Sequence, residues 1–598
     1  MAHTRDHSVD GGSRTDSSPA LRRGSLALWV IFTLFAVYAV CFILRTSFVV
    51  AGERYFSLFD DAMVSMRYAR NLARGDGLTW NPGGLPVEGF TNPLWVAYMA
   101  AVHLIPLPIA KTSLVIQLTA AVLLTINLVF VRDMALSLSR GSYPIAIGAT
   151  VLTATYLPIN NWSLQGMEVS VLLLATSVAM CIALQSIDEC RFRPSQYVVL
   201  AASTLVRLDM AVPLASLLLF HGLVDRPNRR RHIVWGVSSL AVCLVLQSLF
   251  RLWYFGDLLP NTYYLKMTGY PAIPRTMRGL LVLAQFVWRF NPLLFALPFG
   301  LIAARGWRGV FPLWMLTGQM LYSVWVGGDA WEYWGGSNRY ITIAMPGFFV
   351  MLSYALFHGT RHLLNEVAGA RRRVGADGVA FAAAIAVTVA SANSIHGPEA
   401  WAEALLIRAP LHTGAGDENN HEVEEAIALR AVTTADATIA VTRAGTIPYF
   451  SDRRGIDLLG KTDRHVARET SRGRPGLRHF ADFRPGHTKF DYRYSIEQQM
   501  PDIVAQLWTD RDEIRPYLRR YYRTMLLGGA CVYVRAQSPH VMWGHALMQT
   551  PPCPKCSGEY VERLPFTNRS EPVEWLACLR CGRIWSEPKQ PPPTKGGN

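Results

Sequence analysis

The chain has 598 residues, of which 51 % are hydrophobic, and it carries a formal net charge of +15. Its apolar residues are concentrated in long segments, which excludes an ordinary soluble multidomain protein. Only seven of the basic residues are lysines, and arginines gather in short loops such as 226–231 and 371–373. Because cytosolic loops of membrane proteins are enriched in Lys and Arg, the charge indicates membrane orientation, and we expect no nucleic-acid partner.

The first residues predict a short tail followed by a membrane span. Residues 1–25 are polar and Ser-rich, which is typical of a disordered cytosolic tail. Residues 26–44 carry no charge and form about 28 Å of helix, close to the roughly 30 Å of a bilayer core. No A-x-A cleavage site follows, so we expect an uncleaved span. Similar apolar segments follow at 92–131, 144–160, 168–187, 196–220, 232–250, 280–304, 310–326, 340–358 and 378–395.

Two classes of loop alternate between these segments. Arg-bearing loops lie at 132–140, 188–195, 225–232, 305–308 and 361–373, and polar, motif-like loops lie at 50–91, 161–168, 257–279 and 327–339. The two classes of loop alternate strictly if residues 92–131 make one net crossing of the membrane, with a kink at Pro106 and Pro108, and if the segment 196–220 is interrupted near Arg207. A rival count takes 92–131 as two spans and 196–220 as one. Both counts give about eleven crossings.

We therefore predict a polytopic α-helical protein of the bacterial plasma (inner) membrane. Its N-terminus is expected in the cytosol, its membrane domain at 26–395, and all later residues on the extracytoplasmic side. The sequence pattern of residues 396–545 is typical of a soluble α/β domain. It predicts a helix at 422–430 and strands at 437–441 and 531–536. The Pro-rich residues 588–598 are expected to be disordered.

An acidic pair, Asp60 and Asp61, stands just behind the first apolar segment. Carboxylates beside a bilayer are costly to desolvate and are functional candidates, here as a general base on a sugar hydroxyl. The alternative is a helix N-cap, where Asp is common. Two acidic residues, followed by Arg67 and Arg70 on an expected short helix, favour the functional interpretation.

Several motifs in chain order resemble one family, the GT-C glycosyltransferases. They are 59–70 (FDDAMVSMRYAR), 77–78, 80–82, 88–94, 166–168 (GME), 207–209 (RLD), 254–266 (YFGDLLPNTYYLK), 327–329 (GGD) with Arg339, 444–449 (AGTIPY) and 456–460 (IDLLG). Within this GT-C fold, the chain looks most like the mycobacterial terminal β-(1→2) arabinofuranosyltransferases and their bacterial relatives. The resemblance covers about 55–535.

The resemblance implies transfer of a sugar, arabinofuranose in the nearest relatives, from a polyprenyl-phosphate donor to a cell-envelope glycan outside the membrane, in contact with membrane lipids. Asp60 and Asp61 are then the catalytic pair. The leaving phosphate gains negative charge, so cations must meet it, and the candidates are Lys266, Arg339 and Arg207. The alternative for each arginine is interfacial snorkelling. Family members that make a β linkage from a β-linked donor retain configuration, which a single in-line displacement would invert.

Further polar residues in these motifs are candidates for substrate binding. Arg207 and Asp209 lie two residues apart in an apolar stretch, which predicts an internal pair facing a cavity. Glu168 and Asp257 are candidates for binding acceptor hydroxyls or for capping helices. The complete set of predicted substrate-binding residues is Arg67, Glu168, Asp209, Asp257, Asn261 and Asp329. We predict no catalytic metal.

The segment 546–587 contains two C-x₂-C pairs, which typical GT-C enzymes lack. Cys553 and Cys556 are separated by 21 residues from Cys578 and Cys581. This spacing is typical of a zinc ribbon, and four thiolates close the coordination shell, so the predicted zinc is structural. Two disulfides are the alternative, which an oxidising compartment favours.

Two other functions compete with a transferase. Many spans and an intramembrane Arg–Asp pair are compatible with a transporter, although the chain shows no inverted repeat. A catalytically silent GT-C-like factor for envelope or motility assembly is the other alternative. The intact Asp60–Asp61 pair argues against it.

Overall fold

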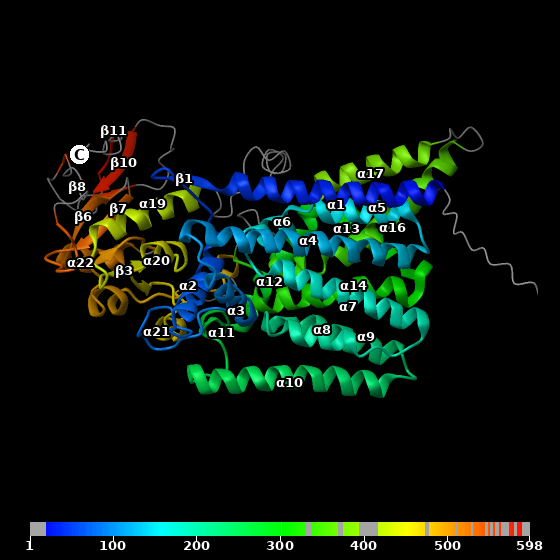
Figure 1. Ribbon diagram of the computed structural model, residues 1–598, viewed down its shortest axis with the longest axis horizontal. Helices are drawn as coiled ribbons and strands as arrows, with labels where there is room; N and C mark the ends of the chain where they lie inside the picture. Colours follow the sequence, from blue (N-terminus) through cyan, green and yellow to red (C-terminus); the bar gives the residue numbers. More distant parts are fainter. Residues whose placement is uncertain are drawn as a thin grey trace, which may run out of the picture.

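Long helices lie side by side in an elongated bundle, and a smaller sheet-containing domain lies at one end of it (Figure 1). The computed structural model describes residues 19–300, 302–330, 338–368, 375–393, 417–472, 478–508, 511–527, 530–543, 548–549, 554–555, 561–563, 573–578 and 583–588. The bundle contains α1 (Pro19–Thr46), α4 (Ile109–Ser139), α5 (Tyr143–Ala154), α6 (Leu157–Leu164), α7 (Val169–Glu189), α8 (Ser195–Ser203), α9 (Ala211–Val224), α10 (Arg229–Phe255), α12 (Ala272–Phe290), α13 (Pro292–Gly300), α14 (Ile302–Val326), α16 (Met345–Ala368) and α17 (Ala376–Ala392).

The bundle has the composition of a membrane domain. Among the described helices, α1, α4, α7 and α10 are long and apolar enough to cross a bilayer, and the pair α12 and α13, bent by 92°, makes a fifth span if counted as one. The total of about eleven crossings remains a prediction. Helix α1 begins at Pro19, so residues 19–25, expected in the disordered tail, are helical.

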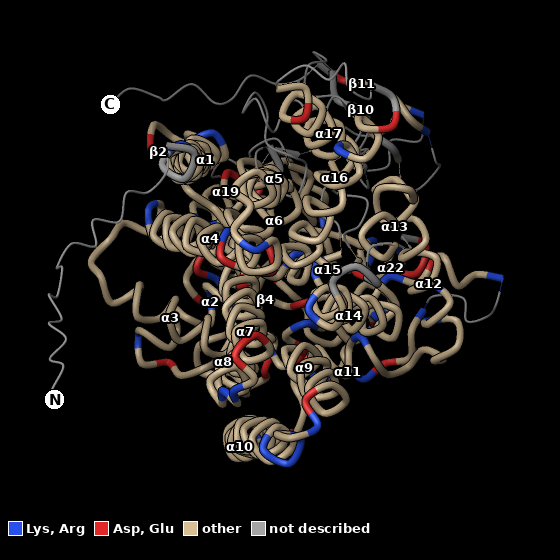
Figure 2. The backbone as a smooth tube through the Cα atoms, turned by 90° about the vertical axis from the view of Figure 1, so that its right-hand side faces the viewer, with Lys and Arg blue, Asp and Glu red and all other residues tan. Residues whose placement is uncertain are grey.

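The two classes of loop lie at opposite ends of the bundle. The Arg-bearing connection between α9 and α10 lies at the end away from the sheet domain, which Figure 2 views directly. The motif-bearing segments lie at the other end, where they contact the sheet domain. This arrangement agrees with the alternation of loops in the sequence.

Two apolar segments fold as the first span count expects. Residues 92–131 contain the separate helix α3 (Pro93–His103), whose 11 residues rise only about 16 Å, and the long α4. Residues 196–220 are broken by a short 3₁₀ turn, Leu208–Met210, between α8 and α9. Its N-cap, Arg207, is extended, with φ −154° and ψ 128°. The break brings polar residues to the motif-bearing end of an otherwise apolar hairpin.

Helix α2 (Asp60–Arg74) lies between the bundle and the sheet domain (Figure 1). A hairpin of β1 (Phe48–Val50) and β2 (Glu53–Tyr55) precedes it, and it ends at Gly75, whose φ of 89° permits the left-handed cap. Its side chains are buried continuously from Ala62 to Asn71, because protein surrounds it on every side. Two other short helices near this boundary are α11 (Asn261–Met267) and α15 (Arg339–Thr342).

The sheet domain, residues 417–549, has a six-stranded mixed sheet of order β4-β3-β5-β7-β6-β8. Strand β3 pairs in parallel with β4 and β5, and the remaining pairs are antiparallel. The helix and two strands expected from the sequence are present as α19, β3 and β7. The elements are α19 (Asp417–Val432), β3 (Thr438–Val441), α20 (Thr446–Ser451), β4 (Arg454–Asp457), α21 (Arg464–Arg468), β5 (Ile503–Val504), α22 (Arg511–Tyr521), β6 (Tyr522–Leu527), β7 (Ala530–Arg535) and β8 (Met548–Gln549), with helical turns at Phe480–Asp482 and Arg493–Gln498.

The C-terminal segment forms a separate three-stranded antiparallel meander. Its strands are β9 (Val561–Arg563), β10 (Val573–Cys578) and β11 (Ile584–Pro588), in the order β11-β10-β9. Buried Cys578 ends β10. Cys553, Cys556 and Cys581 lie outside the described residues, so the metal site remains a prediction.

Candidate active site

The first turn of α2 sends its two carboxylates in different directions. Asp60 Oδ1 accepts hydrogen bonds from the backbone N–H groups of Gly445 and Thr446, each at 3.0 Å. A Cβ atom at position 445 would lie 2.1 Å from the Asp60 carbonyl oxygen, so only glycine permits this approach. Asp61 instead lines a cavity of about 380 Å³ between the bundle and the sheet domain. Asp60 therefore joins the two domains, and Asp61 faces the cavity.

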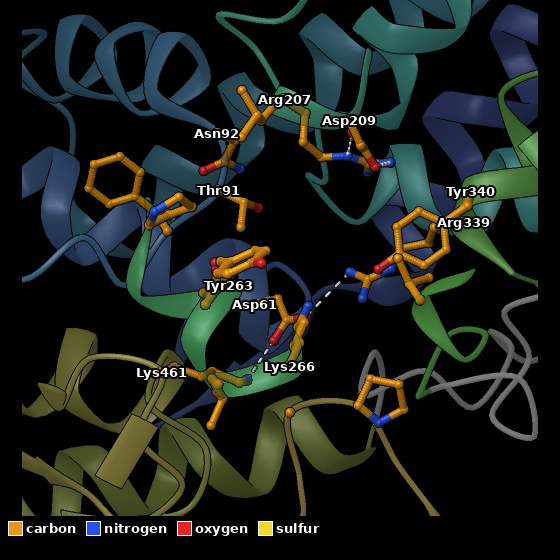
Figure 3. A pocket seen from close by; sticks show the side chains of 18 of the residues that line it. Asp61, Thr91, Asn92, Arg207, Asp209, Tyr263, Lys266, Arg339, Tyr340 and Lys461 are labelled. Atoms are coloured by element: carbon orange, nitrogen blue, oxygen red, sulfur yellow. Dashed lines mark hydrogen bonds and ion pairs between the residues drawn. The ribbon is translucent and has the colours of Figure 1, made fainter. Parts of the chain in front are cut away.

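Asp61 lies at the centre of a group of charged side chains that we call the Asp61 cluster: Asp61, Lys266, Asp329, Arg339 and Lys461 (Figure 3). Lys461 Nζ lies 2.6 Å from Asp61 Oδ1, and Arg339 Nη1 lies 3.3 Å from Asp61 Oδ2. Arg339 also donates from Nε to Asp329 Oδ2 at 2.8 Å. Arg339 therefore bridges two carboxylates.

The electrostatics of this cluster keep Asp61 ionised. Burial raises the pKa of the Asp61 carboxyl, but Lys461, Arg339 and Lys266 together outweigh burial and hold this pKa well below its usual value. Burial lowers the pKa of Lys461, but the adjacent Asp61 reverses the effect and raises it above its usual value. Asp61 is therefore a weak base while these cations surround it.

Lys266 differs from the other cations of the cavity. It is half-buried on α11 and extends toward the same space as Asp61 (Figure 3). Within the part of the chain that the structure describes, it makes no hydrogen bond and no ion pair. Burial, followed by the charge of Arg339, lowers its pKa. With Lys266 protonated, the side chains of the Asp61 cluster that line the cavity are three cations and two carboxylates, an excess of one positive charge. The adjoining Asp60 carboxylate, 3.8 Å from Lys461 Nζ, does not line the cavity and is not included in this sum.

A second group, the Arg207 cluster, consists of Arg207, Glu168 and Asp209 and lines another wall of the same cavity. Arg207 donates to Glu168 Oε1 at 3.1 Å and to both oxygens of Asp209 at 2.7 and 2.8 Å. Asn92 Nδ2 donates to Glu168 Oε2 at 2.9 Å. The predicted internal Arg207–Asp209 pair is present. One cation and two carboxylates give this cluster an excess of one negative charge.

Neutral side chains separate the two clusters. Tyr263 and Thr91 lie between them in the cavity (Figure 3). His487 also lines the cavity, and burial, followed by the charge of Lys461, lowers its pKa to about 4, so that it is neutral at neutral pH. The cavity therefore has a cationic pole, a polar middle and an anionic pole.

Arg67, predicted to bind substrate, is instead part of the joint between α2 and the sheet domain. Its side chain is buried and donates to the backbone carbonyl oxygens of Trp80 at 2.6 Å and Arg453 at 2.7 Å. A third bond reaches the Pro448 carbonyl oxygen. These bonds satisfy the guanidinium inside the protein, and Arg67 is not among the residues that line the cavity.

Asp257 and Asn261, also predicted to bind substrate, are likewise not among the residues that line the cavity. Asp257 forms ion pairs with Arg464 at 3.1 Å and Arg468 at 2.8 Å, both on α21. Asn261 Nδ2 lies within 3.2 Å of three carbonyl oxygens in the loop that begins at Gly460. Both residues hold the bundle to the sheet domain, because polar groups buried at such a boundary must find partners.

Lys461 lines the cavity but was not assigned by the sequence analysis. It follows directly after the 456–460 motif, and the chain uses lysine only seven times against 51 arginines. Two of those seven lysines, Lys266 and Lys461, line the cavity. The rarity of lysine in an arginine-rich chain is the signal that could have identified both residues.

A further group on the sheet domain offers ligand atoms of a kind that bind metals. One nitrogen of His465 and carboxylate oxygens of Glu469 and Asp491 lie within 4.8 Å of one another. His465 Nε2 also lies 3.2 Å from Asp491 and 3.5 Å from Glu469, which an ion-pair network explains. The group does not line the cavity described above.

Comparisons with known proteins give one family match and several similar structures. Residues 412–542 match a family described as a domain of unknown function (DUF8728). The sequence matches no curated protein. The chain is similar to ArnT from Cupriavidus metallidurans in the apo state, at 14 % identity over 85 % of this chain and 98 % of that chain, with a TM-score of 0.49. It is also similar to ArnT bound to undecaprenyl phosphate, with the same identity and coverage and a TM-score of 0.46. An apo oligosaccharyltransferase from Archaeoglobus fulgidus has 10 % identity over 86 % of this chain and 75 % of that chain, with a TM-score of 0.49.

Proposed function

We propose that the chain is a membrane glycosyltransferase that moves a sugar from a polyprenyl-phosphate donor to an extracytoplasmic cell-envelope glycan. The observation that carries this proposal is the excess of one positive charge among the cavity-lining side chains of the Asp61 cluster, together with the ammonium group of Lys266, which forms no hydrogen bond or ion pair with the described residues. A polyprenyl-phosphosugar is a phosphodiester with one negative charge, so the donor phosphate matches this excess. Lys266 and Arg339 are the proposed phosphate ligands.

The proposed transfer keeps the charge of this pole balanced. The acceptor hydroxyl oxygen bonds to the anomeric carbon of the donor sugar, and the bond from that carbon to the phosphate oxygen breaks. The electron pair remains on the phosphate, which becomes a polyprenyl phosphate dianion, and the hydroxyl proton moves to Asp61. The added phosphate charge equals the charge that Asp61 loses, so the donor and cluster together remain neutral throughout.

Asp61, rather than Asp60, is the proposed base. Asp61 faces the cavity, whereas Oδ1 of Asp60 already accepts two backbone hydrogen bonds from the sheet domain. The Arg207 cluster, at the anionic pole of the cavity, is suited to bind the sugar that the same function requires. The carboxylate oxygens of Glu168 and Asp209 are acceptors suited to sugar hydroxyls, and Tyr263 offers a ring for a sugar face.

The proposal also includes the orientation in the membrane, the donor sugar and a metal site in the C-terminal segment. Arginine-rich loops at the end of the bundle away from the sheet domain support a cytosolic position for that end and an extracytoplasmic position for the sheet domain. Arabinofuranose is the first sugar to test, because of the sequence resemblance. The tail is proposed to bind one structural zinc through Cys553, Cys556, Cys578 and Cys581.

A transfer assay with a panel of polyprenyl-phosphate sugars tests this function. Wild type is expected to turn over one member of the panel. Asp61→Asn should lose at least about 10²-fold of that activity, the usual scale for a lost general base. Asp60→Asn is the matched control, because an Asn oxygen can still accept both backbone hydrogen bonds, and it should lose far less.

The outcomes separate the competing functions. Donor binding without turnover in wild type would favour the silent assembly factor. No binding of any polyprenyl-phosphate sugar would contradict the transferase and leave the transporter as the alternative to test.

A further inference from the structure

The sheet domain contributes a side chain to the reacting end of the cavity. Lys461 belongs to the region that matches a family of unknown function. Its Nζ nevertheless lies 2.6 Å from Asp61 and 3.8 Å from Asp60, both on α2. We propose that Lys461 is an exchangeable counter-ion that leaves Asp61 for the donor phosphate when the donor binds. This inference rests on the proposed function and assigns the sheet domain a direct part in the reaction.

The loop that carries Lys461 is held firmly by a carboxylate within the sheet domain. Asp457, at the end of β4, is buried, and its oxygens accept hydrogen bonds from the backbone N–H groups of Leu459, Gly460 and Thr462 at 3.0, 3.1 and 2.7 Å. The Thr462 hydroxyl donates to the same carboxylate at 3.1 Å. Asp457 is therefore a positioning residue, since it fixes the backbone from which the lysine extends.

The bundle holds the same loop from the other side. Asn261, at the start of α11, donates to the carbonyl oxygens of Gly460 and Lys461, both at 3.0 Å. Buried Lys489 donates to the carbonyl oxygens of Tyr264 at 2.8 Å and Ala467 at 2.7 Å, which ties α11 to α21. Helix α11 also carries Lys266, so these bonds hold the backbones that carry the two cavity lysines in a fixed relation.

The fixed backbone and the long, unbranched side chain of Lys461 together make an exchange possible. Without a donor, Lys461 neutralises Asp61, and the carboxylate is a weak base. A phosphate near Lys266 and Arg339 offers Lys461 a stronger partner. When Lys461 turns to the phosphate, Asp61 loses its nearest cation, and its pKa rises. Asp61 then becomes a better base only when a donor is present.

Binding of a simple phosphate ligand tests the exchange without knowledge of the sugar. The probe is farnesyl phosphate, titrated into the full-length protein in detergent. Asp61→Asn should bind this probe more tightly than wild type, by about 10-fold, because Lys461 is released and one negative charge is removed. In the Lys461→Met background, Asp61→Asn should give a clearly smaller gain, because only the removal of the negative charge still acts. In the Lys461→Arg background, which keeps the cation, most of the gain should be preserved.

Control variants separate this inference from the proposed function. Lys266→Ala should weaken probe binding, and His465→Ala, an exposed change on the same domain, should leave it unchanged. Thermal unfolding of each variant verifies that it is folded. Equal affinity of wild type and Asp61→Asn, or a gain of undiminished size in the Lys461→Met background, would overturn the exchange alone. If wild type does not bind the probe, or Lys266→Ala binds it normally, the proposed phosphate site is wrong as well.

Discussion

The two charged clusters of the cavity share one design and differ in one respect. In each, a buried arginine bridges two carboxylates: Arg339 joins Asp61 and Asp329, and Arg207 joins Glu168 and Asp209. Two lysines are added to the Asp61 cluster, whereas the Arg207 cluster receives only neutral partners such as Asn92.

In the proposed function, this difference separates the reaction centre from the surface that recognises the substrate. A buried Arg–carboxylate group by itself is a fixed structure, since removing either partner leaves an uncompensated charge. The two lysines give the cavity-lining side chains of the Asp61 cluster an excess charge and, in the proposed exchange, a cation that can change partners. We therefore expect substitutions in the Asp61 cluster to change the rate of transfer, and substitutions in the Arg207 cluster to change stability and substrate affinity.

The largest expected effect compares the carboxylates of the two clusters. Asp61→Asn should lower kcat by at least about 10²-fold, because the proposed base is removed. Asp209→Asn keeps the shape and one acceptor oxygen, so we expect a loss of roughly 10-fold or less, mostly as a higher KM. Steady-state transfer kinetics measure both. Equal losses in kcat would contradict the assignment of the reaction rate to the Asp61 cluster and of substrate affinity to the Arg207 cluster.

For protein stability we expect the larger effect in the Arg207 cluster when the arginine of each cluster is replaced. Arg207→Ala leaves Glu168 and Asp209 buried without their cation, and the free energy of unfolding should fall by roughly 3–5 kcal/mol. Arg339→Ala should cost less, because Lys266 and Lys461 remain near Asp61 and Asp329. Thermal unfolding in detergent gives the comparison, and a larger loss for Arg339→Ala would contradict it.

The pH dependence of transfer sharpens the difference further. The folded-state pKa of Asp61 lies below its usual value of about 4, so its ion pairs stabilise the protein above that pH and are lost as the pH falls further. The acidic limb of kcat/KM reports the free enzyme, and that of kcat reports the donor complex. If the bound donor draws cations away from Asp61, the pKa of Asp61 rises in the complex. The acidic limb of kcat should then lie at higher pH than the acidic limb of kcat/KM. Coincident limbs would argue against it.

The smallest expected effect is outside both clusters. Truncation after residue 545 removes the edge strand β8 and the cysteine-bearing segment but leaves the cavity residues in place, so transfer should persist at a reduced or similar rate. The intact protein should contain one zinc, and a chelator should unfold the tail alone, since structural zinc supplies roughly 10–16 kcal/mol in such modules. Absence of zinc, with Cys553–Cys556 and Cys578–Cys581 oxidised, would favour disulfides.

Local patterns in the sequence were sufficient for the large features of the fold. Apolar segments, alternating loop classes and period-two strands predicted a helical membrane domain followed by an α/β domain, because each depends on residues close together in the chain. The same holds for the Arg207–Asp209 pair, which spans only two residues. The Asp60–Asp61 pair was also located by its place behind the first apolar segment.

Only the tertiary structure decided which polar residues face the cavity. Asp60 and Asp61 are neighbours, yet Asp60 accepts hydrogen bonds from the backbone of the sheet domain, whereas Asp61 faces the cavity and pairs with the side chain of Lys461, 400 residues away. Arg67 and Asn261 lie in motifs but are satisfied by carbonyl oxygens hundreds of residues away along the chain. The charge around a carboxylate is the sum over everything that packs near it, and that sum exists only when distant segments meet.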